Sequence, residues 1–308
     1  MFDTSSLRAI STEELSRLRP MGTWVPPVVV AELLNQVRSK RSEALARATL
    51  RKISNGGVRV QRDWQDRARM AYGESELWWP RSGKEWLRLV RFCLKNRLWG
   101  EVENTWDALA RDGRIGMSAK EFVDLKANFG ATFAAWVNGY GDLERRTVRA
   151  AVANLEAETG EVLTRTEFKA LREEVAHGLF SSGLRFIPMA RTLSLAAGRA
   201  PYPELDPSAG FEAVNEQHRA ELSYYLEGQS PHLILGIVAS AQLWLDVTAR
   251  GHTATKNDFF DIMVLTYANP EPDWVLAMEE RQWLSRMRRA EVQRIVPIAE
   301  IIRRANDA

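Results

Sequence analysis

The last part of the chain alternates acidic residues with apolar segments, and this pattern constrains the fold more than any other stretch. Asp258 and Asp261 stand at the head of an apolar helical segment. After a Pro-rich break, an apolar segment over 273–278 ends at Glu279 and Glu280. When a fold gathers acids from separate elements, it creates an oxygen-rich site of the kind that hard divalent cations bind. The sequence therefore predicts a metal site assembled from distant parts of the chain.

The beginning of the chain carries a matching acidic element. Asp3 stands at the end of what can only be a short strand. Thr4 and Ser5 follow it, and we expect their hydroxyls to orient ligands or water near a bound metal. A further acid, Glu32, lies in an apolar stretch that begins after Pro27, and proline fits the first turn of a helix. These acids extend the predicted site to the N-terminal part of the chain.

The chemistry explains why several acids are needed. Hydroxide attack on an anionic phosphodiester builds more negative charge, and the metals that neutralise it must themselves be balanced by carboxylates. Asp258 and Asp261 share a helix face at i,i+3, so Asp258 either adds a ligand or only caps the helix. For each acid taken singly, the alternative is a helix cap or a solvated charge. The candidate catalytic residues are Asp3, Glu32, Asp261 and Glu279, and the candidate metal ligands are these four together with Asp258 and Glu280.

Helix signals dominate the rest of the chain. From about residue 100 to 230 nearly every signal is helical. A capping box pairs an N-cap hydroxyl with an acid three residues later and marks the start of a helix. Such pairs occur at Ser11 and Glu14, at Ser118 and Glu121, and at Thr164 and Glu167, and Thr255 with Asp258 has the same spacing.

Strand signals are fewer and come mostly near the two ends. Besides the segment at Asp3, we expect strands over 183–189, 273–278 and 294–297. Strands that alternate with helices imply parallel pairing with helices on both faces of the sheet. The pattern therefore predicts an α/β fold.

Composition narrows the class of protein. Of the 308 residues, 45% are apolar and 27% are charged, which is typical of a soluble globular chain. The formal net charge of +2 implies no general affinity for polyanions. Arginines are nevertheless concentrated near the C-terminal end, where they either bind phosphate or form solvated helix faces. They are Arg281, Arg286, Arg288, Arg289, Arg294, Arg303 and Arg304.

The single cysteine and the spacing of the histidines argue against the common soft-metal sites. Cys93 is the only cysteine, so the chain can build neither an internal disulfide nor a Cys-based zinc site, and we expect Cys93 in the core. The four histidines are scattered without metal-ligand spacing. We expect a cytoplasmic protein, because no signal peptide is visible, and no membrane partner, because apolar runs such as 233–241 are too short to span a bilayer.

Four segments in the right order resemble the PIN-domain family of metal-dependent nucleases. In that family an Asp-Thr/Ser strand end comes first, a helix with Glu-Leu second, an Asp-headed helix third, and a strand followed by an acid fourth. The matching segments are Asp3-Thr4-Ser5-Ser6-Leu7, Val28–Leu34 with Glu32, Asp261–Ala268, and Trp274–Glu279. The family has Thr and Asp where this chain has Ala277 and Glu279.

The resemblance implies a PIN-like three-layer α/β fold, with a short central parallel sheet flanked by helices and a mostly α-helical insertion. The core would comprise residues 1–99 and 230–308, and the insertion residues 100–229. It further implies a Mg²⁺- or Mn²⁺-dependent nuclease, with RNA more expected than DNA because the family is richest in ribonucleases.

Two other hypotheses remain open. In the first, the chain is a catalytically inactive PIN-like scaffold or binding module, and its helical insertion contacts a protein partner, an inhibitor or nucleic acid. In the second, it is an all-helical adaptor whose acids are only helix caps. About four short parallel strands would exclude the adaptor, and metal binding at the acids would separate the nuclease from the scaffold.

Overall fold

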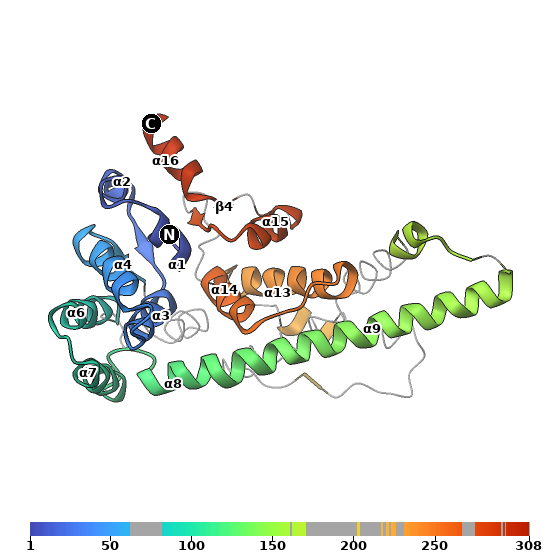
Figure 1. The fold of residues 1–308 in the computed structure, drawn as a ribbon, viewed down its shortest axis with the longest axis horizontal. Coiled ribbons are helices and arrows are strands. Elements are labelled where there is room, and N and C mark those ends of the chain that lie inside the picture. Colours follow the sequence, from blue (N-terminus) through green and yellow to red (C-terminus); the bar gives the residue numbers. More distant parts are fainter. Residues whose placement is uncertain are drawn as a thin grey trace. The chain divides into compact units, whose positions relative to one another are not determined.

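The computed structural model describes residues 1–61, 82–160, 162–170, 202–203, 217, 220–221, 223–225, 231–266, 275–290, 292 and 294–307. Most of these residues are helical (Figure 1). The predicted strand over 183–189 lies outside the described residues, as do residues 267–274, which end one of the PIN-like segments and begin another.

The chain divides into two compact units. Unit 1 comprises Met1–Phe129 and Phe260–Ala308, and unit 2 comprises Gly130–Phe259. In the sequence, unit 2 is thus an insertion between the two segments that form unit 1. The predicted domain boundaries after residues 99 and 229 fall earlier in the chain than these divisions, and they stay a prediction.

Unit 1 contains short helices and very short strands. Its helices are α1 (Thr4–Ala9), α2 (Thr12–Leu18), the 3-10 turn η1 (Arg19–Met21), α3 (Pro27–Val37), α4 (Glu43–Asn55), α6 (Ser82–Lys95), α7 (Trp99–Arg111), α8 (Ala119–Asp124), the π-helical turn η2 (Leu125–Phe129), most of α14 (Lys256–Thr266), α15 (Arg281–Arg289) and α16 (Ile298–Asp307). Its strands are β1 (Trp24–Val25), β2 (Arg59–Val60), β3 (Leu276–Ala277) and β4 (Ile295–Val296).

The helix starts follow the predicted local signals. The Ser11 hydroxyl accepts the Glu14 N–H and the Glu14 carboxylate accepts the Ser11 N–H, which completes a capping box at α2. The same reciprocal pair starts α8, and Pro27 occupies the first turn of α3. Helix α3 is almost wholly buried, which explains its run of valines. These predictions are confirmed because caps and proline act through residues close in sequence.

The predicted fold class is wrong. A PIN-like three-layer fold needs a central sheet between helical layers, whereas the described strands are two residues long and form two separate two-stranded sheets. The segments 273–278 and 294–297 contain β3 and β4, but in each segment only two residues take part in strand pairing. Such short ladders offer little sheet surface. The apolar residues are therefore buried mainly between helices, and α3, α4, α6 and α7 pack against one another (Figure 1).

An all-helical chain is not found either. Strand β1 pairs with β2, and β3 pairs with β4, both in parallel. The N-terminal residues lie beside both pairs, because the Phe2 N–H donates to the Trp24 carbonyl at 2.9 Å while Phe2 forms a parallel bridge with Ala277. The backbone next to Asp3 is thus hydrogen-bonded to segments near both ends of the chain.

Aromatic side chains link the helices of unit 1. The rings of Trp86 and Trp106 meet edge to face with centroids 5.7 Å apart, and Phe122 lies 6.2 Å from Trp106. Phe260 continues the series at 5.7 Å from Phe122. Such ring contacts stabilise the packing beyond the effect of burying the rings. Cys93 is buried in the same unit, as predicted, and burial raises the pKa of its thiol.

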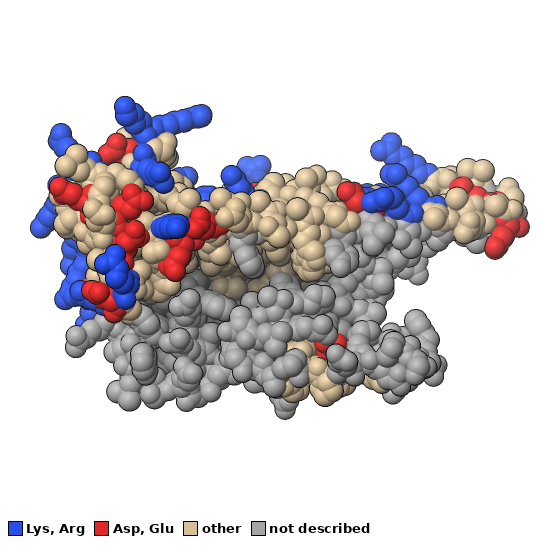
Figure 2. Space-filling model, turned by 90° about the horizontal axis from the view of Figure 1, so that it is seen from below, with Lys and Arg blue, Asp and Glu red and all other residues tan. Residues whose placement is uncertain are grey.

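The surface of unit 1 over α6 and α7 mixes both signs of charge. Lys and Arg side chains lie there among Asp and Glu side chains (Figure 2). This face accordingly forms no field of a single sign, in keeping with the small net charge of the chain.

Unit 2 is built on two long helices that run side by side, α9 (Gly130–Thr159) and α13 (Pro231–Arg250) (Figure 1). The rings of Trp136 and Trp244 meet edge to face at 4.9 Å. Gly141 is buried at the contact, where a methyl group on its Cα would lie 2.5 Å from Cγ1 of Val247. The two helices can approach this closely because Gly141 has no side chain.

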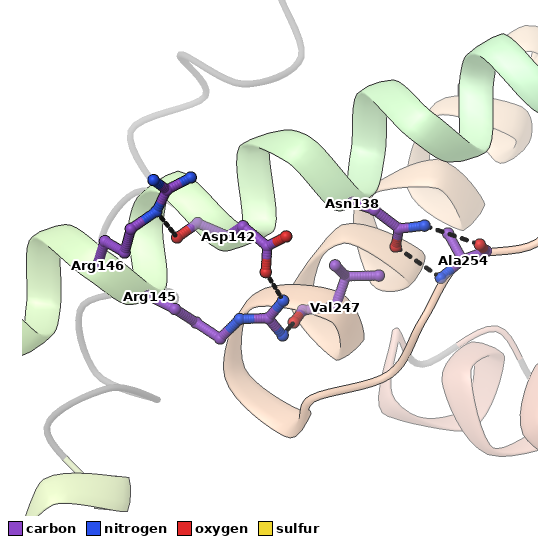
Figure 3. A network of polar contacts seen from close by, with 6 residues as sticks. All are labelled: Asn138, Asp142, Arg145, Arg146, Val247 and Ala254. Carbon is purple, nitrogen blue, oxygen red and sulfur yellow. Dashed lines mark hydrogen bonds and ion pairs between the residues drawn. The ribbon is translucent and has the colours of Figure 1, made fainter.

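Polar contacts from α9 hold the end of α13 and the segment after it (Figure 3). Asn138 donates to the Ala254 carbonyl at 2.9 Å and accepts the Ala254 N–H at 2.8 Å. Arg145 donates to the Val247 carbonyl at 2.8 Å and pairs with Asp142. The last carbonyls of a helix have no partners within the helix, so Arg145 satisfies one of them from outside.

We predict that Gly141→Ala destabilises unit 2 by about 1–3 kcal/mol, because the new methyl group must displace a packed valine. Gly139→Ala is the matched control, since nothing lies within 4 Å of a methyl group there. It should leave stability unchanged or raise it by about 0.5–1 kcal/mol, because alanine favours the helix. Hydrogen exchange of peptides from α9 and α13 measures both effects. Equal effects of the two variants would contradict the close contact.

Candidate functional site

Asp3 is the best-defined acid of the predicted site. It is 5% exposed and stands directly before α1, as its N-cap. Its Oδ1 accepts the Ser6 N–H at 2.7 Å, and its Oδ2 accepts the Ser5 hydroxyl at 2.6 Å. Both oxygens thus have a donor, and the Ser5 hydroxyl orients the Asp3 carboxylate. The role of Ser5 beside a bound metal stays a prediction.

The environment of Asp3 disfavours its negative charge. Burial raises the pKa of the Asp3 carboxyl, and the nearby charge of Glu279 raises it further. The hydrogen bonds from Ser5 and Ser6 oppose these effects but do not cancel them. A buried carboxylate beside a second acid is charged more readily when a cation lies close by.

Parallel pairing explains why Glu279 lies near enough to Asp3 for its charge to act on the Asp3 carboxyl. The Asp3 N–H donates to the Ala277 carbonyl at 3.2 Å, and Glu279 follows two residues after Ala277. Parallel strands end at the same edge, so the acids that follow them come together there. Glu279 is half-buried, and its Oε1 accepts the Ile298 N–H at the start of α16, at 2.7 Å.

Glu32 is connected to this pair through Thr4. From α3, the Glu32 Oε2 accepts the Thr4 hydroxyl at 2.6 Å, and Thr4 is the next residue after Asp3. The Glu32 Oε1 lies 3.3 Å from Gln36 Nε2 and 3.5 Å from Lys126 Nζ. Glu32 is thus connected to Asp3 through the side chain of the next residue, whereas Glu279 acts on Asp3 by its charge.

Lys126 was not singled out from the sequence. It lies on the π-helical turn η2, and its ammonium also sits over the Phe260 ring at 5.2 Å. A π-helical turn is rare and recurs at functional sites, but no residue pattern before Lys126 announces it. This missed cation balances part of the charge of Glu32.

Helix α1 is held at both ends, which fixes Asp3. At its far end Lys52 of α4 donates to three backbone carbonyls, those of Leu7 at 3.1 Å, Arg8 at 2.9 Å and Ile10 at 2.6 Å. A cation at a helix C-terminus satisfies the free carbonyls and the helix dipole. Desolvation at this position lowers the pKa of Lys52.

The other predicted acids have different surroundings. Asp258 belongs to unit 2, where its Oδ2 accepts both the N–H and the hydroxyl of Thr255, at 2.8 and 2.9 Å, and lies 3.7 Å from His252 Nε2. The alternative that Asp258 caps its helix thus has direct support. Asp261 is half-buried on α14 in unit 1, and Glu280 is exposed immediately before α15. A role for Asp261 or Glu280 in metal binding stays a prediction.

The carboxylates suit a Mg²⁺ or Mn²⁺ site in which the protein supplies only one or two ligands. No group of three or more His, Cys, Asp and Glu among the described residues is arranged to hold a metal ion. Mg²⁺, however, is usually held by one or two carboxylates, with water and substrate phosphate as its other ligands. Asp3 and Glu279 fit that arrangement, because both are oxygen donors that follow neighbouring parallel segments.

Comparison with protein-family models, with curated proteins and with solved structures finds no match to this chain. Within the described part of the chain, no helix has both the length and the apolar character to cross a membrane.

We predict that Asp3→Asn stabilises the metal-free protein at neutral pH. The raised pKa means that the folded carboxyl holds its proton to higher pH than the unfolded one, so stability falls as pH rises through the folded pKa. Asparagine is uncharged and is an equally good N-cap. In EDTA at pH 7–8 the variant should melt a few degrees above wild type, and the gap should close as pH falls toward the ordinary value of 3.8.

Thermal unfolding across this pH range tests the prediction. Glu13→Gln, on the exposed side of α2, is the control and should melt like wild type at each pH. A destabilised Asp3→Asn at every pH would show that the charge-assisted hydrogen bonds outweigh the cost of burying the charge.

Proposed function

We propose that the chain is a Mg²⁺- or Mn²⁺-dependent nuclease that hydrolyses phosphodiester bonds, with Asp3 and Glu279 as the central acids. The supporting observation is the pairing of a buried Asp3 with Glu279 at the shared end of neighbouring parallel strands. Two acids so placed repel each other, and a divalent cation relieves that repulsion. The proposal rests on this local geometry and requires no particular fold class.

Each side chain has a defined part in this proposal. A bound divalent cation would activate water and neutralise charge on the phosphoryl oxygens. Asp3 and Glu279 would hold the cation, and Ser5 keeps the Asp3 carboxylate oriented through its 2.6 Å hydrogen bond. Glu32 is fixed by Thr4, so it is oriented toward the same region.

Lys126 would place a positive charge beside Glu32. Its ammonium is 3.5 Å from Glu32 Oε1, and its side chain is 24% exposed, so a phosphate can reach it from solvent. Lysine binds phosphate as a point charge. In the proposed reaction Lys126 therefore helps to position the anionic substrate.

The competing function is a binding module without catalysis. It is favoured by a specific observation, namely that three of the acids already have structural partners. Asp3 caps α1, Glu279 accepts the first N–H of α16, and Asp258 accepts the N–H of Thr255. Helix caps of this kind contribute about 0.5–2 kcal/mol each to stability, which is enough reason for an acid to stand there.

Cleavage assays decide between the two functions. Labelled RNA and DNA are incubated with the full chain in Mg²⁺, in Mn²⁺ and in EDTA. We expect metal-dependent cleavage, and we expect Asp3→Asn and Glu279→Gln to reduce it by more than about 100-fold, beyond the cost of losing an outer-shell partner. Thr4→Val should reduce it by about 10–100-fold, because Glu32 loses its orienting hydroxyl.

The exposed Glu13→Gln serves as the control and should cleave like wild type. A wild-type chain that cleaves neither nucleic acid, and whose melting temperature does not respond to Mg²⁺ or Mn²⁺, would reject the nuclease and leave the binding module.

A further inference from the structure

Helix α15 has two chemically distinct faces. Trp283, Leu284, Arg286 and Met287 are buried in unit 1. Arg286 is wholly buried, and its guanidinium stacks over the Trp283 ring at 4.5 Å, so this arginine is part of the packing. The opposite face is exposed and consists of Arg281, Gln282, Ser285, Arg288 and Arg289.

The charged residues on the exposed face of the helix itself are all arginines, and the exposed Glu280 precedes them. The helix reads RQWLSRMRR and contains no Asp or Glu. Arg281, Ser285 and Arg288 or Arg289 recur at helical spacing, so they project from one side. The Arg289 guanidinium donates to the Ser285 hydroxyl at 2.8 Å, which holds these two polar groups on the same face.

The spacing suits a phosphate backbone. Arg281 and Arg288 lie about 10 Å apart along the helix axis, at about 1.5 Å per residue. Nucleic acid carries one phosphate per nucleotide, so arginines spread over this span can each contact a different phosphate of one strand. Guanidinium groups bind phosphate oxygens through paired N–H donors, which makes arginine well suited to the task.

Two other helices of unit 1 carry acids of their own beside their arginines. On α16 the Glu300 carboxylate binds both Arg303, at 2.8 Å, and Arg304, at 3.0 Å, and these bonds lower the pKa of Glu300 to about 2. On α2, Arg17 pairs with Glu13 at 2.6 Å. In these helices an acid from the same helix offsets the arginine charge, whereas α15 supplies no acid of its own.

The position of α15 links this face to the candidate site. Glu279 and Glu280 immediately precede Arg281, so the basic face begins where the acids end. The acids lie at the helix N-terminus, while Arg288 and Arg289 lie in the last turn. A strand bound along α15 would therefore have one end near Glu279.

We propose that the exposed face of α15, formed by Arg281, Ser285, Arg288 and Arg289, binds the phosphate backbone of nucleic acid. This inference rests on the proposed nuclease function for the identity of the polyanion. It concerns binding without metal, so it can be tested apart from cleavage.

The test measures binding of the full chain to a short labelled single-stranded RNA, and to DNA of the same sequence, by fluorescence anisotropy in EDTA. The test variant is Arg281→Gln with Arg288→Gln and Arg289→Gln. The control is Arg17→Gln with Arg303→Gln and Arg304→Gln, which removes the same charge from ion-paired positions. All six side chains are exposed, and melting curves verify that both variants are folded.

We expect the α15 variant to bind at least about tenfold more weakly, and the slope of log K against log salt to fall by about 2, the value for three phosphates on a single strand. The control should keep most of the wild-type affinity. Equal losses in both variants would show a general effect of net charge and overturn the inference. So would a wild-type chain that binds no nucleic acid.

The two proposals fail separately. Asp3→Asn should still bind RNA in EDTA although it no longer cleaves. A chain that binds through α15 but never cleaves would reject the nuclease alone. A chain that cleaves and is indifferent to the α15 substitutions would reject the binding face alone.

Discussion

The backbone pairing of the first three residues is the constraint on which unit 1 depends. The Phe2 N–H bonds to the Trp24 carbonyl, while the Asp3 N–H and the Met1 carbonyl bond to Ala277. The bonds to Ala277 join segments separated by more than 250 positions in the chain. Closing so long a loop costs entropy that grows only slowly with length, so the burial of the surrounding helices can offset it. This pairing is what brings Asp3 and Glu279 close together.

The same pairing brings a second acid near the buried Asp3 carboxyl, which disfavours the negative charge of Asp3. Asp3 satisfies the first turn of α1, yet its burial and its acidic neighbour raise the pKa of its carboxyl. A stabilising cap and a destabilising charge thus occur in one side chain. Acids kept in such surroundings are often those that a protein uses chemically, although structural networks shift pKa values as well. The surroundings of Asp3 accordingly support the nuclease proposal, and its capping role supports the alternative.

Charge on unit 1 is organised by local pairing more than by total charge. Arginines on α2 and α16 are offset by acids of their own helices, and the face over α6 and α7 mixes both signs (Figure 2). The exposed side of α15 differs because its helix contains no acid. A small net charge therefore does not exclude a local basic surface, which is why the distribution of arginine is more informative than the sum.

The sequence by itself determined the features that depend on nearby residues. The capping boxes at Ser11 and Ser118, the helix start at Pro27 and the burial of Cys93 follow from local geometry and apolar pattern, and all are found. The sequence also predicted the positions of two strands, β3 and β4. It did not predict their length, because the number of residues that pair depends on a partner elsewhere in the chain.

Only the tertiary structure decided the fold class and the composition of the site. Short strand signals led to the prediction of a central sheet, but the helices bury most of the apolar residues against one another instead. Lys126 joins Glu32 because a π-helical turn and a distant helix bring them together, and Asp258 became a helix cap in a different unit from Asp3. Residue type and spacing limit which groups are able to act. Which of them meet is set by packing between segments far apart in the chain, and no local pattern encodes it.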